Sequence, residues 1–165
     1  MRIFLSYGHD EHASLAERLC RELGNKDGLQ RTLGNQAAIL YARGALDGAT
    51  ALYKEQERLC RELGNMAGLS SSLGNQANIL QARGNLDGAM ALYKEVERRS
   101  CELGKPEGIA ISLANQAVLL SSTPGRRREA RRLADEALAI ATSHGYQQLV
   151  PQFQRIRGSI LAGAE

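Results

Sequence analysis

Aromatic residues and proline are scarce in this sequence. It has no tryptophan, five tyrosines, two phenylalanines and three prolines among 165 residues. Sheets favour aromatic and β-branched side chains, whereas Ala, Leu, Glu, Arg and Gly dominate here. Pro106, Pro124 and Pro151 fall where a helix would begin or a turn is needed. The composition therefore predicts an all-α fold, and the length is that of a single domain.

Cysteine, net charge and long apolar runs are also limited. Cys20, Cys60 and Cys101 are odd in number and fall in helical patterns, which predicts small buried residues in a reducing compartment and no disulfide framework. Their spacing matches no metal site, so no metal or other cofactor is expected. A net charge of +3 does not suggest a dedicated nucleic-acid binder. Because no apolar run is long enough for a signal peptide or a membrane span, a cytoplasmic protein without a membrane partner is expected.

A repeat of 40 residues organises the chain. Residues 17–56 and 57–96 are identical at 30 of 40 aligned positions. A third copy runs through residues 97–120 and, after one inserted residue near Pro124, continues through residues 126–145. A last half-copy occupies roughly residues 147–162. Self-similarity at such a fixed period is the mark of a repeat architecture.

Each copy carries two helical patterns separated by glycine. Leu29, Leu33, Ala37 and Leu40 recur at spacings of three and four before Gly44. The second pattern runs from Leu46 to Leu63 and ends at Gly64. One helix pair cannot bury its apolar faces alone, so the pairs must stack. The sequence predicts a right-handed α-solenoid over 17–162, with units at about 28–65, 68–105 and 108–145 and a final helix at 148–162.

The glycine-centred half of each copy resembles the tetratricopeptide repeat (TPR). Gly44, Ala49 and Tyr53 match its second-helix signature, as do Gly84, Ala89 and Tyr93, whereas the third copy has Ala134 where tyrosine is expected. The 40-residue length is similar to the longer variant found in partner-of-inscuteable proteins, kinesin light chains and bacterial signalling proteins. The first-helix position that is usually aromatic in this family is occupied by Leu33, Leu73 and Leu113. The resemblance implies a protein-binding scaffold for signalling.

Residues 1–16 do not fit the repeat. They resemble the opening of a Toll/interleukin-receptor (TIR) domain, with a strand ending in Ser6-Tyr7 followed by a helix. The later TIR sheet and its catalytic glutamate region are missing, so the NAD-cleaving activity of some relatives is not carried over. Two interpretations stay open: a truncated or recombined member of a TIR–TPR family, or an unrelated amphipathic cap. In either case Ala13, Ala16, Leu19 and Leu23 are expected to cover the first helix pair.

Three asparagines are the main binding candidates. In this family the first helices line a concave face, and the resemblance implies that Asn35, Asn75 and Asn115 clamp the backbone of an extended peptide there. The alternatives are a structural hydrogen bond between helices, or simple persistence after duplication. For Gln36, Gln76 and Gln116 we favour structural hydrogen bonds. Positions beside the asparagines that vary between copies are candidates for specificity: Arg31, Tyr41, Ser71, Asn78, Gln81, Ile111 and Val118.

The remaining features do not predict an enzyme. His9, His12 and His144 lie outside the repeat pattern, and the glycines are helix stops rather than a phosphate loop. The arginines of residues 126–132 form a cluster that is either a solvated helix face or a surface for acidic protein or nucleic acid. We expect a scaffold that binds another protein or peptide. Self-assembly into homo-oligomers is an alternative, and a nucleic-acid adaptor is less favoured.

Overall fold

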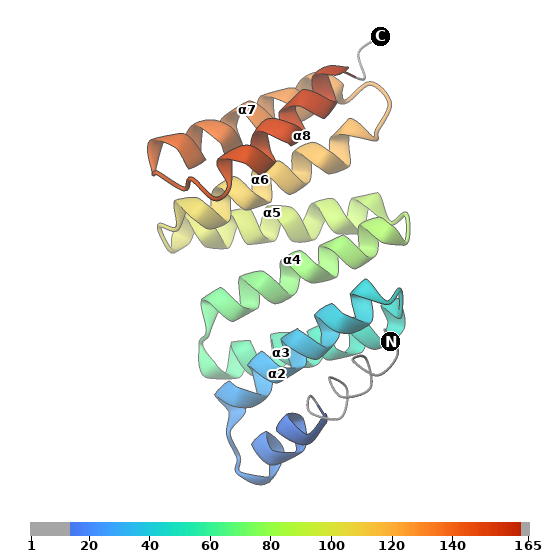
Figure 1. The fold of residues 1–165 in the computed structure, drawn as a ribbon, viewed down its shortest axis with the longest axis vertical. Helices are drawn as coiled ribbons and strands as arrows, with labels where there is room; N and C mark the ends of the chain where they lie inside the picture. Colours follow the sequence, from blue (N-terminus) through green and yellow to red (C-terminus); the bar gives the residue numbers. More distant parts are fainter. Residues whose placement is uncertain (1–13, 163–165) are drawn as a thin grey trace, which may run out of the picture. The chain divides into compact units, whose positions relative to one another are not determined.

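The computed structural model describes residues 14–162, and in this range the protein is built from helices without any strand (Figure 1). Residues 14–22 are helical. They are followed by α2 (Lys26–Ala42), α3 (Leu46–Leu63), α4 (Met66–Ala82), α5 (Leu86–Glu102), α6 (Pro106–Ser121), α7 (Arg127–Ser143) and α8 (Val150–Ala162). The all-α, helical-repeat prediction is confirmed. The strand expected before Ser6-Tyr7, and most of the TIR-like segment with it, lies outside the described residues.

Glycine ends or follows the helices in a fixed pattern. The glycines at residues 24, 44, 64, 84, 104, 125 and 145 all have positive φ, between 58° and 77°. This left-handed conformation is strained for residues with a side chain, and it lets the chain reverse direction after a helix. Gly64, for example, caps α3 with φ 64°. The predicted helix stops at Gly44 and Gly64 are therefore confirmed.

Asparagine side chains cap three of the helix N-termini. The Oδ1 atoms of Asn25, Asn65 and Asn85 accept hydrogen bonds from the backbone N–H groups three residues later, at 2.8, 3.0 and 2.9 Å. The N-cap of α3 is Ala45, which makes no side-chain hydrogen bond. Residue 45 aligns with Asn85, so this cap is present in one copy and missing in the other.

Restoring the missing cap is expected to stabilise the protein. Ala45→Asn should raise the free energy of unfolding by about 1 kcal/mol, because its amide oxygen would accept from a free N–H group in the first turn of α3. Asn85→Ala should lower it by a similar amount. Thermal unfolding followed by circular dichroism measures both changes. A lower melting temperature for Ala45→Asn would contradict the prediction.

The chain divides into two compact units, residues 1–79 and 80–165. In unit 1, α2 packs against α3, and Leu33 and Leu59 are buried between them with Leu29. The part of α4 that belongs to unit 1 is tied to α3, because the Ser72 hydroxyl donates to the Tyr53 carbonyl at 2.7 Å. Ile79 is buried beside Tyr53. This packing fixes the first helices of two successive copies on the same second helix.

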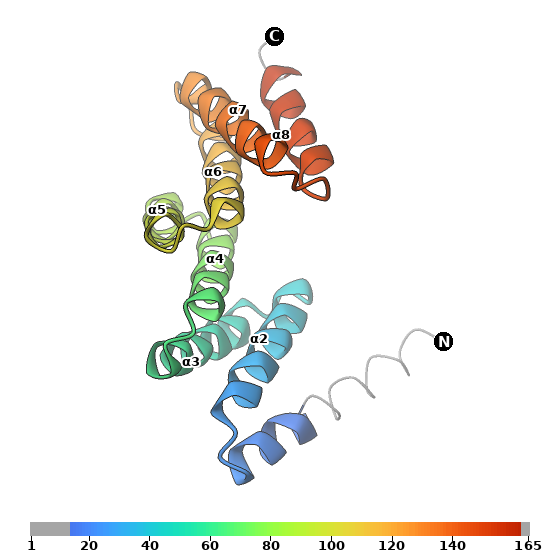
Figure 2. The ribbon, with the colours of Figure 1, turned by 90° about the vertical axis from the view of Figure 1, so that its left-hand side faces the viewer.

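Unit 2 has the larger core. There α6 packs against α5, α7 and α8, and α8 also lies along α7 (Figures 1 and 2). Alanines with no exposed surface bring α6 and α7 close together, among them Ala117, Ala130 and Ala137. Phe153 and Ile160 of α8 complete the same cluster. The final helix therefore covers the apolar side of the helix pair that precedes it.

The prediction that all three cysteines are buried is wrong. Cys60 is buried, Cys20 is half-buried and Cys101 is exposed. The position in the next copy that aligns with Cys60 is Ser100, which is 3% exposed, and the cysteine stands one residue later. One residue rotates a side chain by about 100° around a helix, which turns Cys101 to solvent.

The prediction that apolar residues of the N-terminal helix cover the first helix pair is also wrong for the residues that the structure describes. Ala16 is exposed, and Leu19 and Leu23 are 46% and 79% exposed. Leu59, which aligns with Leu19, is buried against the first helix of its own pair, α2. Residues 14–22 have no such helix before them in the described part of the chain. Ala13 lies outside the described residues.

Candidate functional site

A groove of about 690 Å³ lies in unit 1 between the first helices of two successive copies, and we call it the α2–α4 groove. Helix α3 contributes its floor through Gln56. Of the residues predicted to bind a peptide, Arg31, Asn35 and Asn75 line it, together with the specificity candidate Ser71. The other lining residues are Asp27, Gln30, Gly34, Ala38, Gln56, Asn65, Ala67 and Gly68.

The amides of Asn35 and Asn75 are free within the described part of the chain. Asn35 is exposed and Asn75 is half-buried, and neither side chain has a hydrogen-bond partner among residues 14–162. An amide carries two N–H donors and one carbonyl acceptor. Both asparagines therefore bring unused donors and acceptors to one groove.

The neighbouring glutamines behave differently. Gln76 donates from Nε2 to Glu57 at 2.8 Å and to the Ser72 hydroxyl at 3.4 Å. In unit 2, Gln116 donates to Glu97 at 2.6 Å and to Ser112 at 3.4 Å. The structural role predicted for these two residues is confirmed.

The structural role predicted for Gln36 is wrong within the described residues. Thr32 takes the place of the serine that the other two copies have, and its hydroxyl donates instead to the carbonyl of Gly28 in its own helix, at 3.0 Å. Gln36 has no hydrogen-bond partner among residues 14–162. The two glutamine networks each combine a glutamate and a serine, and the first copy has threonine at the serine position.

The floor of the α2–α4 groove is made of buried polar side chains. Gln30 is 3% exposed, donates to Asp27 Oδ1 at 3.3 Å and accepts from the Cys60 thiol at 3.3 Å. Burial raises the pKa of the Cys60 thiol, and the nearby carboxylates of Asp27 and Glu57 raise it further. Cys60 is therefore a protonated hydrogen-bond donor near neutral pH rather than a reactive thiolate.

Two glycines of the lining pack closely against the side chains of the floor. A Cβ atom on Gly34 would lie 2.5 Å from Gln56 Nε2, and one on Gly68 would lie 2.7 Å from Cys60 Sγ. Larger residues at these positions would displace the side chains of the floor. Gly34 and Gly68 therefore leave room for the Gln56 and Cys60 side chains between the helices.

Differences between the two most similar copies concentrate in this groove. Five of the ten positions that differ between residues 17–56 and 57–96 contribute to its lining. The asparagines and glycines of the lining are shared by both copies, whereas the buried glutamines of the floor are not. Sequence reasoning proposed the asparagines but missed Gln30 and Gln56. The available signal was their difference from Ser70 and Val96.

The other predicted binding residues lie elsewhere. Tyr41 is 38% exposed on α2, and Asn78 is half-buried on α4; neither lines the α2–α4 groove. Gln81 accepts a hydrogen bond from the Tyr93 hydroxyl at 3.2 Å within unit 2. Asn115 of unit 2 is half-buried on α6, and its amide is unpaired within the described residues.

Three of the five arginines in the 126–132 cluster are ion-paired. Arg126 bonds to Glu129 at 2.7 Å, Arg132 bonds to Glu136 at 3.1 Å, and Arg131 lies 3.7 Å from Asp135. All three pairs are exposed and join residues three or four positions apart, at the N-cap of α7 or within it. Such pairs neutralise part of the positive charge and contribute little to stability. They favour the interpretation of this cluster as a solvated helix face.

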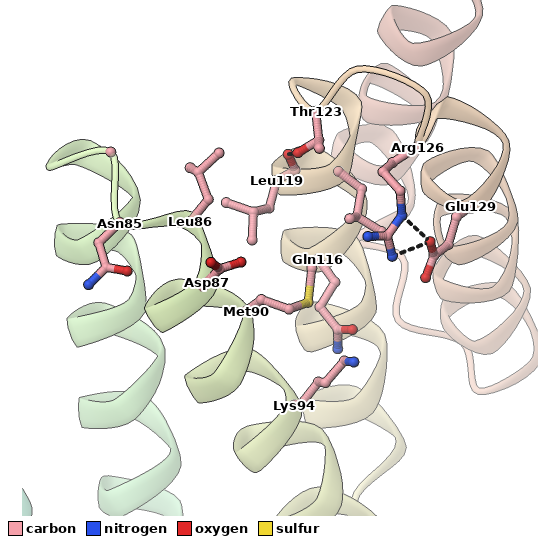
Figure 3. Close-up of a pocket in the computed structure, with 12 residues that line it drawn as sticks. Asn85, Leu86, Asp87, Met90, Lys94, Gln116, Leu119, Thr123, Arg126 and Glu129 are labelled. Carbon is pink, nitrogen blue, oxygen red and sulfur yellow. Dashed lines mark hydrogen bonds and ion pairs between the residues drawn. The ribbon is translucent and has the colours of Figure 1, made fainter.

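Unit 2 contains a second hollow of about 460 Å³ between α5, α6 and the start of α7. Figure 3 shows Met90 and Leu119 at its centre, Asp87 above Met90, and the Arg126–Glu129 pair on the α7 side. Thr123 and Arg126 belong to the loop that carries the inserted residue of the third copy. The lining of this hollow thus contains both apolar and charged side chains, and its amides, Asn85 and Gln116, already have hydrogen-bond partners.

Comparison with known proteins agrees with the geometry of the helix pairs. A family model described as Tetratricopeptide repeat matches residues 69–103. A search of curated proteins found no match. None of the helices in the described range is both long and apolar enough to cross a bilayer.

Two solved structures share the fold. BtubC (BKLC) from P. vanneervenii superposes with a TM-score of 0.72 at 18% identity, over 93% of this chain and 72% of that one. A kinesin light chain-type protein of Podosopora anserina with nearly identical TPR-like repeats superposes with a TM-score of 0.61 at 15% identity, over 99% of this chain and 92% of that one. The protein therefore has a TPR-like helical-repeat fold. Repeats of this type generally mediate interactions between proteins.

Proposed function

We propose that this protein is an interaction scaffold, and that the α2–α4 groove binds an extended peptide segment of a partner protein. One observation carries the proposal. Asn35 and Asn75, forty residues apart in the sequence, line one groove with unpaired amides, whereas the adjacent Gln76 is held by Glu57 and Ser72. The structural alternative was a hydrogen bond between adjacent helices, and neither asparagine makes one within the described residues.

The chemistry of the groove suits a peptide backbone. An extended backbone offers alternating N–H and C=O groups, and an amide side chain can pair with one of each. Arg31 and Asp27 bring one charge of each sign, so the lining has no strong preference for a charged ligand. On this proposal the protein is a cytoplasmic binding module without catalysis, and Asn115 is the corresponding candidate of unit 2 taken by itself.

Filling the groove tests the proposal. Peptides would first be selected from a random display library on the purified wild-type chain. Ala38 is an exposed lining residue of the groove, so Ala38→Trp should weaken the binding of a selected peptide by about tenfold or more, because the indole would occupy the ligand's place. Titration calorimetry measures the affinity.

The matched control is Ala51→Trp. Ala51 is also an exposed alanine in unit 1, but it lies on α3 outside the groove lining. Ala51→Trp should leave the affinity within a factor of about two, since it changes the same residue type on a helix surface. Equal affinities for both variants would show that peptides bind elsewhere, and the α2–α4 groove would then lose its proposed role.

A further inference from the structure

Gln56 is a buried polar residue of the α2–α4 groove that the second copy does not retain. It is 7% exposed, it lines the groove, and the aligned residue of the next copy is Val96, itself 8% exposed. Its Oε1 atom is buried and has no hydrogen-bond partner, and no other buried side-chain oxygen or nitrogen among the described residues is left unpaired in this way. An unpaired buried carbonyl destabilises a fold. Since the repeat accepts valine at this position, the helix packing does not require the amide.

The Gln56 amide lies against Gly34 in the floor of the groove, and its carbonyl oxygen is not satisfied by the fold. Gly34 has no side chain to cover the amide, and even a Cβ there would come within 2.5 Å of Nε2. The other buried glutamine of the floor, Gln30, already has both ends engaged, with Asp27 and the Cys60 thiol. Gln56 is therefore the floor residue with unused hydrogen-bonding capacity, and because its Oε1 has almost no exposed surface, the amide must turn about its last torsion to meet a ligand.

The chemistry of an amide selects its best partner. A carboxylate can accept from the N–H groups of Gln56 but leaves Oε1 unpaired, whereas an ammonium group can donate to Oε1 but cannot accept. A carboxamide does both at once. The last torsion of a glutamine side chain is broad, so the Gln56 amide can turn to match a carboxamide in either sense. Arg31 and Asp27, with opposite charges, give neither a cation nor an anion an advantage in the lining.

We propose that Gln56 is a specificity-determining residue that makes the α2–α4 groove prefer peptides carrying Asn or Gln opposite its amide. This inference rests on the peptide-binding function proposed above, and it specifies which side chain of the bound peptide the groove would recognise. The shared asparagines would hold the peptide backbone, and the variable floor would select the sequence. A groove floored by valine in place of Gln56 would instead prefer an aliphatic side chain.

The test compares wild type with Gln56→Val, the residue that the second copy carries. Each purified chain would be used to select from the same display library of random nine-residue peptides. Wild type should select peptides that share Asn or Gln at one position, and changing that residue to Leu or Glu should weaken binding by about tenfold. Gln56→Val should select no carboxamide there and should bind the Leu-substituted peptide at least as well as the original.

Thermal unfolding provides an independent readout that needs no ligand. Gln56→Val should melt at a higher temperature than wild type, because it removes an unpaired buried carbonyl. Gain of stability together with loss of selectivity is expected only if the amide is kept for binding. A lower melting temperature would show that Gln56 supports the fold, and the proposal would be overturned.

The outcomes separate this proposal from the broader one. If both chains select the same carboxamide, or if wild type selects peptides without one, Gln56 does not determine specificity while peptide binding still stands. If neither chain selects any peptide although both have the helical circular dichroism spectrum, the peptide-binding function fails and this inference fails with it.

Discussion

Replacing Asn35 and Asn75 together by alanine is expected to weaken the binding of a selected peptide by about 100-fold. Each amide can form two hydrogen bonds to an extended backbone, and each net bond contributes about 0.5 to 1.5 kcal/mol. Loss of roughly four bonds accounts for the expected change, since about 1.4 kcal/mol corresponds to a factor of ten in affinity. Each single variant should lose about tenfold.

The same double variant should be as stable as wild type or slightly more stable. The two amides have no hydrogen-bond partner within residues 14–162, so their removal leaves no buried group unpaired. Alanine is also the better helix former, by about 0.5 kcal/mol at each site. If the asparagines held the fold together, the double variant would be less stable than wild type. Measuring stability and affinity together therefore distinguishes a binding role from a structural one.

Calorimetric titration of the selected peptide, together with thermal unfolding, measures both quantities. Gln152→Ala is the matched control, because it removes an exposed amide from α8 in unit 2. Asn35→Asp with Asn75→Asp keeps the side-chain shape but removes the N–H donors, and it should bind nearly as weakly as the alanine variant. An affinity within a factor of about two of wild type would remove the asparagines from the proposed clamp.

Much of the fold was predictable because the spacing of apolar residues and the positions of glycine agree in successive copies of the repeat. Apolar spacing placed the helices, and Gly44 and Gly64 marked their ends through the conformation that glycine alone adopts freely. These features depend on residues close together in sequence. The unit boundaries proposed from the repeat, by contrast, remain predictions.

The corrections concern features that depend on neighbours in space. Leu19 was expected to cover the first helix pair but is exposed, because the burial of its aligned residue Leu59 depends on α2, a helix with no counterpart before residues 14–22 in the described range. Cys101 was assigned by residue type, although the one-residue shift relative to Cys60 places it on another side of its helix. In the first case an aligned residue lacks the neighbours of its counterpart, and in the second the cysteine does not stand at the aligned position.

The floor of the candidate site was missed for a related reason. Gln30 and Gln56 belong to different helices, twenty-six positions apart in the sequence, and no local pattern links them to Asn35. Comparison of the copies did contain a signal, because both glutamines are replaced in the second copy. Only the packed structure shows that these differences meet in one groove.

Tyr93→Ala is the single change expected to destabilise the protein most. Tyr93 is 1% exposed in unit 2, and its hydroxyl donates to Gln81 at 3.2 Å. Its backbone carbonyl also accepts from the Ser112 hydroxyl at 2.6 Å, which joins α5 to α6. Removing the ring leaves a cavity in a close-packed interface, and the expected cost is about 3 to 5 kcal/mol.

The third copy shows why the chain accepts alanine at one such position and not at another. Ala134 occupies the aligned site and is 1% exposed, and Phe153 of α8 belongs to the same buried cluster. Tyr93 is not among the residues of that cluster. Tyr93→Ala should therefore leave its cavity unfilled.

Tyr93→Phe separates the ring from the hydroxyl. It keeps the packing and loses only the bond to Gln81, so it should cost about 1 kcal/mol. Urea unfolding of wild type and the two variants, followed by circular dichroism, gives the order and size of the effects. Because a domain of this size is stabilised by only about 5 to 15 kcal/mol in total, Tyr93→Ala should lose a large part of its resistance to urea. A loss of less than about 1 kcal/mol for Tyr93→Ala would mean that the core of unit 2 relaxes around the cavity, and that the tyrosine of the repeat signature is not what holds α5 in place.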